Sequence, residues 1–133
     1  MKTIKIIIEK AKDGSYGAYA ENVKGIYGAG DTPQECKQSI VEAIDTIKSY
    51  FEEEQIPKEL KGNYELVFKF DIESLLQYYK GVLSNPAFEK LTGINQKLIH
   101  QYSTGLKKPR KPQRERIQNG LHQLGKELLA IEL

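Results

Sequence analysis

The chain has 133 residues, of which 39% are hydrophobic and 29% are charged, and its formal net charge at pH 7 is +2. This composition is ordinary for a globular protein of one medium domain or two small ones, and it argues against disordered and fibrous classes. No apolar run approaches the roughly 20 residues of a membrane span, so we expect no membrane contact and a cytoplasmic location. The single cysteine, Cys36, excludes an internal disulfide.

Charge is divided unevenly along the chain. Residues 1–70 carry 10 Lys against 12 Asp and Glu, a net charge of −2, whereas residues 71–133 carry 10 Lys and Arg against 6 Asp and Glu, a net charge of +4. Between Lys90 and Arg116 there are eight basic residues and one acid, Glu115. This distribution predicts a basic patch in the C-terminal half that binds phosphate groups.

Three antiparallel strands are predicted before residue 31. The first, Lys2–Glu9, alternates polar and apolar residues and then becomes apolar, and Asp13–Gly14 forms a hairpin turn after it. The second strand is Tyr16–Glu21. The third is short, Ile26–Tyr27, and lies between glycines that bend it or introduce a bulge.

A long helix follows and runs to about Glu54. Thr32 is suited to cap its free amides, Pro33 is tolerated at the first helical position, and Glu35 completes a capping box. The apolar residues fall at spacings of three and four on one face, which should lie across the sheet. These inward positions are Cys36, Ile40, Ala43, Ile44, Ile47 and Phe51.

Residues 65–70 alternate again, with Leu66, Phe68 and Phe70 on one face, and are predicted to form a last strand. Residues 1–70 therefore predict a domain with the order β-β-β-α-β, in which an antiparallel sheet packs against one long helix. With the helical remainder, the fold class is α+β.

Residues 71–133 predict a second, all-helical domain of four helices. Asp71 is placed to cap the first, Asn85–Pro86 the second and Asn95 the third, and Pro112 begins a long closing helix. Gly120 and Gly125 each weaken that last helix and indicate a kink or a close packing contact. The inward positions are Ile72, Leu75, Leu76, Tyr79, Leu83, Phe88, Leu91, Leu98, Ile99, Tyr102, Ile117, Leu121, Leu124, Leu128 and Leu129.

The stretch from Leu91 to Gly105 predicts a helix-turn-helix, in which Gly93 forms the turn between two short helices. If Leu98, Ile99 and Tyr102 face the core, the opposite face of the helix is polar and is free to contact the major groove of DNA. Glutamine suits a bidentate contact with adenine, lysine suits guanine or phosphate, and the helix N-terminus offers backbone amides. The predicted DNA-binding residues are Asn95, Gln96, Lys97, His100, Gln101, Thr104, Lys107, Lys108 and Arg110.

The alternative explanation for each of these residues is a solvated surface, because polar helix faces and basic loops are usually just exposed to water. The agreement of a glycine turn, a capped second helix, outward carboxamides and a trailing basic loop favours DNA binding over that explanation.

Other chemistry-bearing residues give weaker signals. His100 and His122 do not have the spacing of a metal site, and Cys36 fits a small core residue better than a nucleophile. Residues 28–30, Gly-Ala-Gly, fit a tight turn better than a phosphate loop, because the longer glycine fingerprint and the lysine are missing. Four scattered acids are expected to be solvated rather than to bind metal: Glu9, Asp13, Glu21 and Asp31.

Both halves of the chain resemble the HicB-type antitoxins of bacterial toxin-antitoxin pairs. The N-terminal match is a short hairpin followed by Gly25-Ile26-Tyr27-Gly28-Ala29-Gly30-Asp31-Thr32-Pro33-Gln34-Glu35, and it extends into Val41-Glu42-Ala43-Ile44 of the long helix. The C-terminal match, Leu91 to Gly105, is similar to the Cro/repressor-like helix-turn-helix that many such antitoxins carry. One departure is clear: residues 21–26 replace the family's Pro-Glu-Leu-Pro-Gly-Cys loop, and only the glycine survives.

The resemblance implies a partial ribonuclease-H-like N-terminal domain without catalytic carboxylates, which binds and blocks a small HicA-type toxin that cleaves mRNA. It also implies that the C-terminal domain dimerises, binds operator DNA and represses the pair's own promoter.

We therefore expect an antitoxin and autorepressor that acts as a homodimer or a higher homo-oligomer, without enzymatic activity or cofactor. One alternative is a helix-turn-helix transcriptional regulator whose N-terminal domain senses a ligand or only oligomerises, with no toxin partner. Another is a metal-dependent nuclease that uses Glu9, Asp13 and neighbouring acids.

Overall fold

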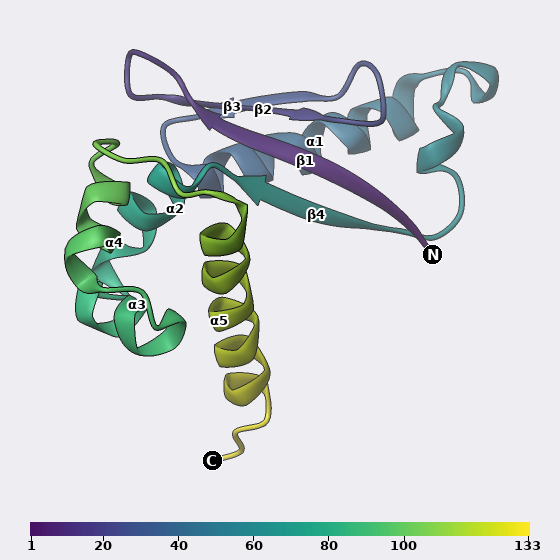
Figure 1. Cartoon of the computed structure of the whole chain (residues 1–133). Coiled ribbons are helices and arrows are strands. Elements are labelled where there is room, and N and C mark those ends of the chain that lie inside the picture. The colour runs from purple at the N-terminus through teal and green to yellow at the C-terminus, as the bar shows by residue number, and fades with distance from the viewer. The chain divides into compact units, whose positions relative to one another are not determined.

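The computed structural model describes residues 1–133, and the contacts within the chain divide it into unit 1, Met1–Asp71, and unit 2, Ile72–Leu133. Unit 1 holds a four-stranded mixed sheet and one helix, and unit 2 holds four helices, so the fold is α+β (Figure 1). None of the helices combines the length and the apolar composition needed to cross a lipid bilayer.

The sheet of unit 1 has the strand order β3-β2-β1-β4. Its strands are β1 (Lys2–Lys10), β2 (Tyr16–Ala20), β3 (Tyr27–Gly30) and β4 (Tyr64–Phe70). The prediction of three antiparallel strands at the N-terminus is confirmed, but the prediction of a wholly antiparallel sheet is wrong, because β4 runs parallel to β1. The helix between β3 and β4 carries the chain across the sheet, and such a crossover connection allows two strands to run in the same direction.

Helix α1 (Pro33–Tyr50) lies against one face of this sheet (Figure 1). The inward side chains of the central strand, Ile4, Ile6 and Ile8, are fully buried beneath it. The helix contributes the buried residues Cys36, Ile40, Ile44 and Ile47 to the same core. These positions follow the three- and four-residue spacing of the sequence, which is why the packing face was predictable.

The ends of α1 differ from the prediction. Thr32 Oγ1 accepts a hydrogen bond from the Glu35 amide (3.1 Å), but the Glu35 carboxylate accepts from the Asp31 amide (2.6 Å) instead of closing the box on Thr32. The helix ends at Tyr50 rather than near Glu54, and Phe51 is extended and half exposed. Two 3₁₀ turns follow, Glu53–Gln55 and Lys58–Leu60, and the second buries Leu60 in the core.

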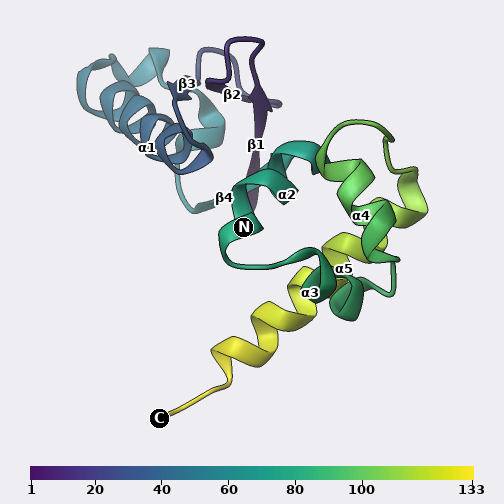
Figure 2. The same ribbon diagram turned by 90° about the vertical axis from the view of Figure 1, so that its left-hand side faces the viewer.

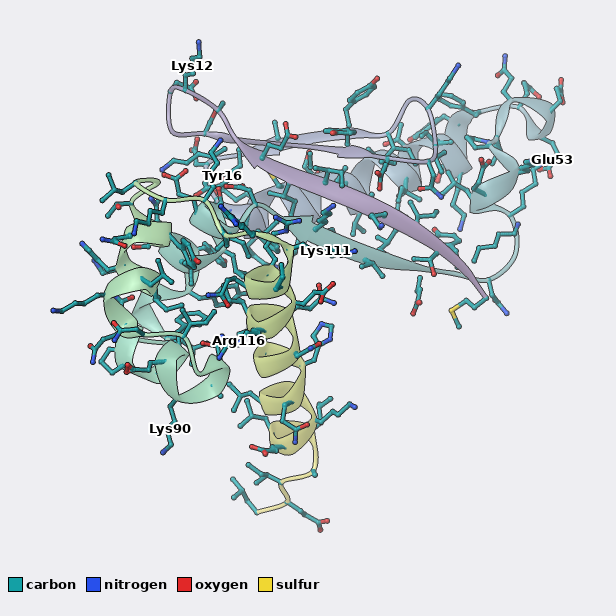
Figure 3. The ribbon with its side chains drawn as sticks, in the orientation of Figure 1. Lys12, Tyr16, Glu53, Lys90, Lys111 and Arg116 are labelled. Carbon is teal, nitrogen blue, oxygen red and sulfur yellow. The ribbon has the colours of Figure 1, made fainter.

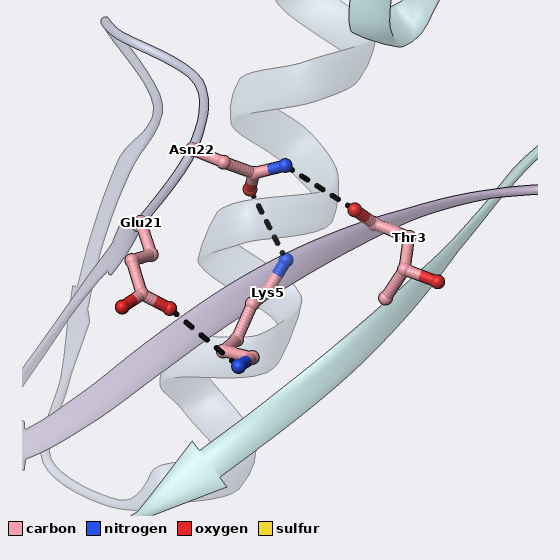
Figure 4. Close-up of polar contacts among 4 residues, drawn as sticks. All are labelled: Thr3, Lys5, Glu21 and Asn22. Carbon is pink, nitrogen blue, oxygen red and sulfur yellow. Dashed lines mark hydrogen bonds and ion pairs between the residues drawn. The ribbon is translucent and has the colours of Figure 1, made fainter.

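The side chain of Asn22 continues the sheet where β2 ends (Figure 4). Its Nδ2 donates to the Thr3 carbonyl (3.2 Å) and its Oδ1 accepts from the Lys5 amide (3.4 Å). Lys5 also forms an ion pair with Glu21, with 3.8 Å between Nζ and Oε2. The carboxamide thus satisfies two backbone groups of β1 on the side away from β4, where β2 no longer pairs with the strand. The chain then bends through residues 21–26, and β3 begins at Tyr27 rather than at Ile26, which is buried.

Unit 2 consists of α2 (Ile72–Tyr78), α3 (Asn85–Thr92), α4 (Gln96–Ser103) and α5 (Lys111–Leu129). Its core is a single cluster of Leu76, Phe88, Ile94, Ile99, Tyr102 and Ile117. The first helix is shorter than predicted, since a 3₁₀ turn at Tyr79–Gly81 replaces its last part. Gly81 accounts for this ending, because glycine is a poor helix former.

The C-terminal end of α5 is exposed in unit 2. Ile117 is fully buried, but Leu128 is 56% exposed and Leu129 is 90% exposed, so the prediction that both face inward is wrong. Helix α3, which packs on α5, has eight residues and spans about 12 Å, whereas α5 has nineteen and spans about 28 Å. Figure 2 shows α5 extending past α3 toward the C-terminus.

Gly120 marks a close contact between α5 and α3. A Cβ atom at Gly120 would lie 2.7 Å from the Leu91 carbonyl oxygen, whereas a Cβ atom at Gly125 would have no neighbour within 4 Å. Both glycines weaken the same helix, but only Gly120 is required by a close packing contact.

We predict opposite effects for alanine at these two positions. Gly120→Ala forces the helices apart and should lower the free energy of unfolding by about 1–3 kcal/mol, whereas Gly125→Ala should raise it by up to about 1 kcal/mol through helix propensity. Urea unfolding of both variants measures the difference. Equal shifts of the same sign would show that α3 and α5 do not pack this closely.

Candidate functional site

The outward face of α4 lines a shallow hollow with a volume of about 520 Å³. Six side chains line it, and all of them carry hydrogen-bond donors while none is acidic: Asn85, Asn95, Gln96, Lys97, His100 and Gln101. Five of these residues are among those predicted from the sequence to bind DNA. An open hollow lined by carboxamides, an imidazole and an ammonium group is suited to a polar, electron-rich ligand.

Burial of the opposite face fixes the orientation of α4. Ile99 and Tyr102 are buried in the core of unit 2 and Leu98 packs against it, as predicted. Gln96, Lys97 and His100 are consequently exposed, and Gln101 is half-buried at the border of the two faces.

The turn between α3 and α4 is held by backbone conformation and by one buried hydroxyl. Gly93 has φ +75°, a left-handed conformation that ends α3 and favours glycine. Thr92 Oγ1 donates to the Phe88 carbonyl (2.7 Å) and accepts from the Ile94 amide (3.1 Å). In Figure 3, Arg116 extends from α5 toward this turn, where a Cβ atom at Gly93 would lie 2.7 Å from its Nη2.

The first amides of α4 already have acceptors within the protein. Asn95 Oδ1 accepts from the Lys97 amide (2.8 Å), which confirms Asn95 as the N-cap. Glu89 Oε1 accepts from the Gln96 amide (3.2 Å). The expectation that this helix N-terminus offers free amides to a phosphate is therefore wrong for these two groups, and the outward side chains carry the binding potential of the site.

Asn85 is the residue of the hollow that sequence reasoning missed. The sequence predicts Asn85 as the cap of α3, but Ser84 is the N-cap, and its Oγ accepts a hydrogen bond from the Ala87 amide (3.2 Å). Asn85 instead occupies the first helical position, and its half-buried side chain lines the hollow. Serine and asparagine are both strong N-cap residues, so local sequence could not decide between them.

The other predicted residues follow α4 and are not among those that line the hollow. Thr104 Oγ1 donates to the Gln101 carbonyl (3.2 Å), and the Lys107 amide donates to the same carbonyl (3.2 Å). Lys107, Lys108 and Arg110 are exposed. Arg114 Nη1 donates to the Pro109 carbonyl (3.0 Å). These bonds tie both ends of the basic segment to neighbouring helices.

The weaker candidates in unit 1 have structural roles. Burial, and next the charge of Glu35, raise the pKa of the Cys36 thiol, which suits a core residue. Gly28 and Gly30 lie in strand β3 rather than in a turn. A side chain at position 28 would crowd α1, because a Cβ atom there would lie 3.1 Å from Ile40 Cγ1. Asp13 accepts from the hydroxyl and the amide of Ser15, and these bonds lower the pKa of its carboxyl group.

No three His, Cys, Asp or Glu side chains are grouped so that they could hold a metal ion. The predicted acids occupy separate places, and Glu21 pairs with Lys5.

Unit 1 has a second, smaller hollow of about 270 Å³ beside residues 21–24. Tyr19, Ile26 and Tyr27 are among its lining residues.

The chain is similar to one curated protein of a bacterium. It is 43% identical over 56 residues to the UPF0150 protein ssr1765 of Synechocystis sp., and the alignment covers 41% of this chain and 71% of that relative. No family model matches the chain. No solved structure matches it either.

The capping role of Asn95 predicts a loss of stability that is separate from ligand binding. Asn95→Ala removes the acceptor of the Lys97 amide and should lower the free energy of unfolding by about 1 kcal/mol, whereas Asn95→Ser should preserve most of it. Urea unfolding of both variants provides the comparison. If the alanine variant is as stable as the serine variant, the cap contributes nothing.

Proposed function

The chain belongs to the UPF0150 family, and we propose that it is a HicB-type antitoxin that neutralises a HicA-type mRNA-cleaving toxin and represses its own operon by binding operator DNA. In this proposal α3 and α4 form a helix-turn-helix, and unit 1 is a partial ribonuclease-H-like domain that binds the toxin. The observation that carries the DNA-binding half is the hollow on α4, with six donor side chains and no carboxylate.

The side chains of α4 have the chemistry to read base edges. Gln96 and Gln101 are suited to bidentate contacts with adenine, and Lys97 is suited to guanine or phosphate. Asn85 borders the same hollow from α3, where the first helix of such a motif crosses the DNA backbone. Lys107, Lys108 and Arg110 come next in the chain and would contact phosphates without reading sequence.

The apolar seam of α5 supports dimerisation of the DNA-binding unit. Ile117, Leu121, Leu124 and Leu128 recur at spacings of four, three and four residues, which place them on one face of the helix. The first of them is buried within the unit and the last is 56% exposed. A second copy related by a two-fold axis would cover the exposed end of this seam, and its half-site would lie one helical turn of DNA, or a multiple, away.

The open face of the sheet in unit 1 supports a protein partner. Helix α1 covers one face only, and the other face carries Tyr27 (71% exposed), Tyr19 and Val67. Tyr19 and Tyr27 face each other in the β2–β3 register and border the smaller hollow. Exposed apolar patches with a polar surround commonly mark protein-binding surfaces, and we assign the toxin to this face.

The toxin partner is tested by co-expression with the product of the neighbouring gene. We expect a small basic protein to co-purify with this chain. We also expect co-expression of this chain to relieve the growth arrest that the small protein causes in the host cells. Tyr27→Ser should weaken that complex, whereas Tyr50→Ser, at the end of α1, should not, although Tyr50 is similarly exposed. The absence of any complex would leave the alternative of a transcriptional regulator without a toxin.

The recognition helix is tested by Gln96→Ala combined with His100→Ala. This double variant should lose specific binding to DNA from the protein's own upstream region, by at least about tenfold, because base contacts are removed. The matched control, His122→Ala with Gln123→Ala, removes the same residue types from exposed positions of α5. Unchanged affinity in the first variant, measured by fluorescence anisotropy, would show that α4 does not read the DNA.

The phosphate contacts are tested by salt dependence. Each neutralised phosphate adds about 0.9 to the slope of log affinity against log salt concentration, so glutamine at Lys107, Lys108 and Arg110 should reduce that slope by about 2 to 3. Glutamine at three exposed lysines of unit 1, Lys12, Lys24 and Lys58, changes the net charge equally and should leave the slope unaltered. Equal reductions in both variants would refute a specific phosphate clamp.

A further inference from the structure

Strand β4 is a long free edge of the sheet. It pairs with β1 on one side, and the strand order leaves its other side at the end of the sheet. The strand has seven residues and contains neither proline nor glycine, whereas the opposite edge strand, β3, has four residues of which two are glycine. Natural proteins usually protect such an edge by shortness, proline, a bulge, charged side chains or a covering element, because its unpaired backbone groups bind another strand. Of the sequence devices, β4 has only the charges of Glu65 and Lys69.

The side-chain order of β4 is complementary to itself in the antiparallel direction. If two copies of β4 pair with Val67 opposite Val67, then Glu65 lies opposite Lys69 on both sides of the centre. Both residues are exposed on the sheet face that α1 leaves uncovered. Opposite charges directly across an antiparallel pair are stabilising, whereas a parallel pairing in register would place like charges opposite each other.

The inner face of β4 lacks the apolar cover that the neighbouring strand has. The inward isoleucines of β1 are fully buried. The inward side chains of β4 are only half-buried, and these are Tyr64, Leu66, Phe68 and Phe70. Lysine side chains of α1 lie over the rings instead. Lys37 Nζ is 5.1 Å from the ring centre of Phe68, and Lys48 Nζ is 5.0 Å from that of Tyr64.

The same antiparallel pairing would also match these inward residues. It places Leu66 opposite Phe68 and Tyr64 opposite Phe70 of the other copy, so an aliphatic side chain meets an aromatic one at the first pair and two aromatic rings meet at the second. Aromatic pairs of this kind add to sheet stability, and their contact removes half-exposed apolar surface from water. One register thus satisfies the charges of the outer face and the apolar residues of the inner face.

We propose that two copies of this protein pair through β4, antiparallel and centred on Val67, so that their four-stranded sheets join into one continuous sheet. The pairing does not depend on the proposed antitoxin activity, because its evidence lies in β4 alone. It uses one edge of the sheet and leaves Tyr27, which lies on the opposite edge strand β3, outside the interface.

Charge exchange across the interface provides the main test. All variants are made in the full chain with Leu128→Lys, which places a charge in the α5 seam and removes that second route to a dimer. Glu65→Lys and Lys69→Glu should each raise the dimer dissociation constant at least about tenfold at low ionic strength, since each places like charges opposite each other twice. Sedimentation velocity measures the dissociation constants.

Two combinations should restore the dimer. The double variant Glu65→Lys with Lys69→Glu regains opposite charges within a homodimer, and an equimolar mixture of the two single variants regains them in a heterodimer. Recovery in both samples supports the β4 pairing and also shows that the single variants fold. A Leu128→Lys protein that is monomeric at the highest soluble concentration, or a mixture that stays monomeric, overturns the proposal.

A disulfide locates the two-fold axis independently. Residues directly opposite in an antiparallel pair have Cα atoms about 4.5–5.5 Å apart, which is within the range of a disulfide. Val67→Cys should therefore form a covalent dimer under mild oxidation, while Ala29→Cys, exposed on the opposite edge strand, should not. Cys36 is buried in both variants. Cross-linking through Ala29→Cys alone would place the interface at β3 and contradict the proposal.

Discussion

Helix α4 has eight residues and one buried face, and this constraint determines what unit 2 presents to other molecules. Ile99 and Tyr102 share a core with Phe88 and Ile117, so the helix cannot rotate without exposing them. The left-handed turn at Gly93 and the close approach at Gly120 hold α3 and α5 around that core. The polar residues of α4 are thereby held on the outside together, at the hollow.

Unit 1 is organised around its central strand in a comparable way. The buried isoleucines of β1 receive α1 on one face, and the other face of the sheet stays open. Asn22 completes the backbone pairing of β1 where β2 turns away. Each unit thus has its own core and its own exposed surface, which fits a protein with two separate binding tasks.

Periodicity and capping residues were sufficient to predict the inward face of α4, the N-cap Asn95 and the packing face of α1, because these depend on neighbours in sequence. The direction of β4 and the exposure of Leu128 depend on segments far away in the sequence, and the hydrogen bond of Glu89 depends on the turn that brings the start of α4 beside α3. No local pattern shows that α3 is too short to cover the end of α5, or that a carboxylate of α3 binds the Gln96 amide. Asn85 was missed because two adjacent residues were equally suited to the cap.

NMR titration of the full protein with DNA from its own upstream region tests most directly whether the hollow on α4 binds DNA, as we propose. The side-chain amide signals of Asn85, Gln96 and Gln101 and the ring signals of His100 should shift together and saturate at one stoichiometry. The signals of Asn22, in the sheet of unit 1, should remain in place. Shifts confined to unit 1 or to α5, with the hollow unaffected, would contradict the claim.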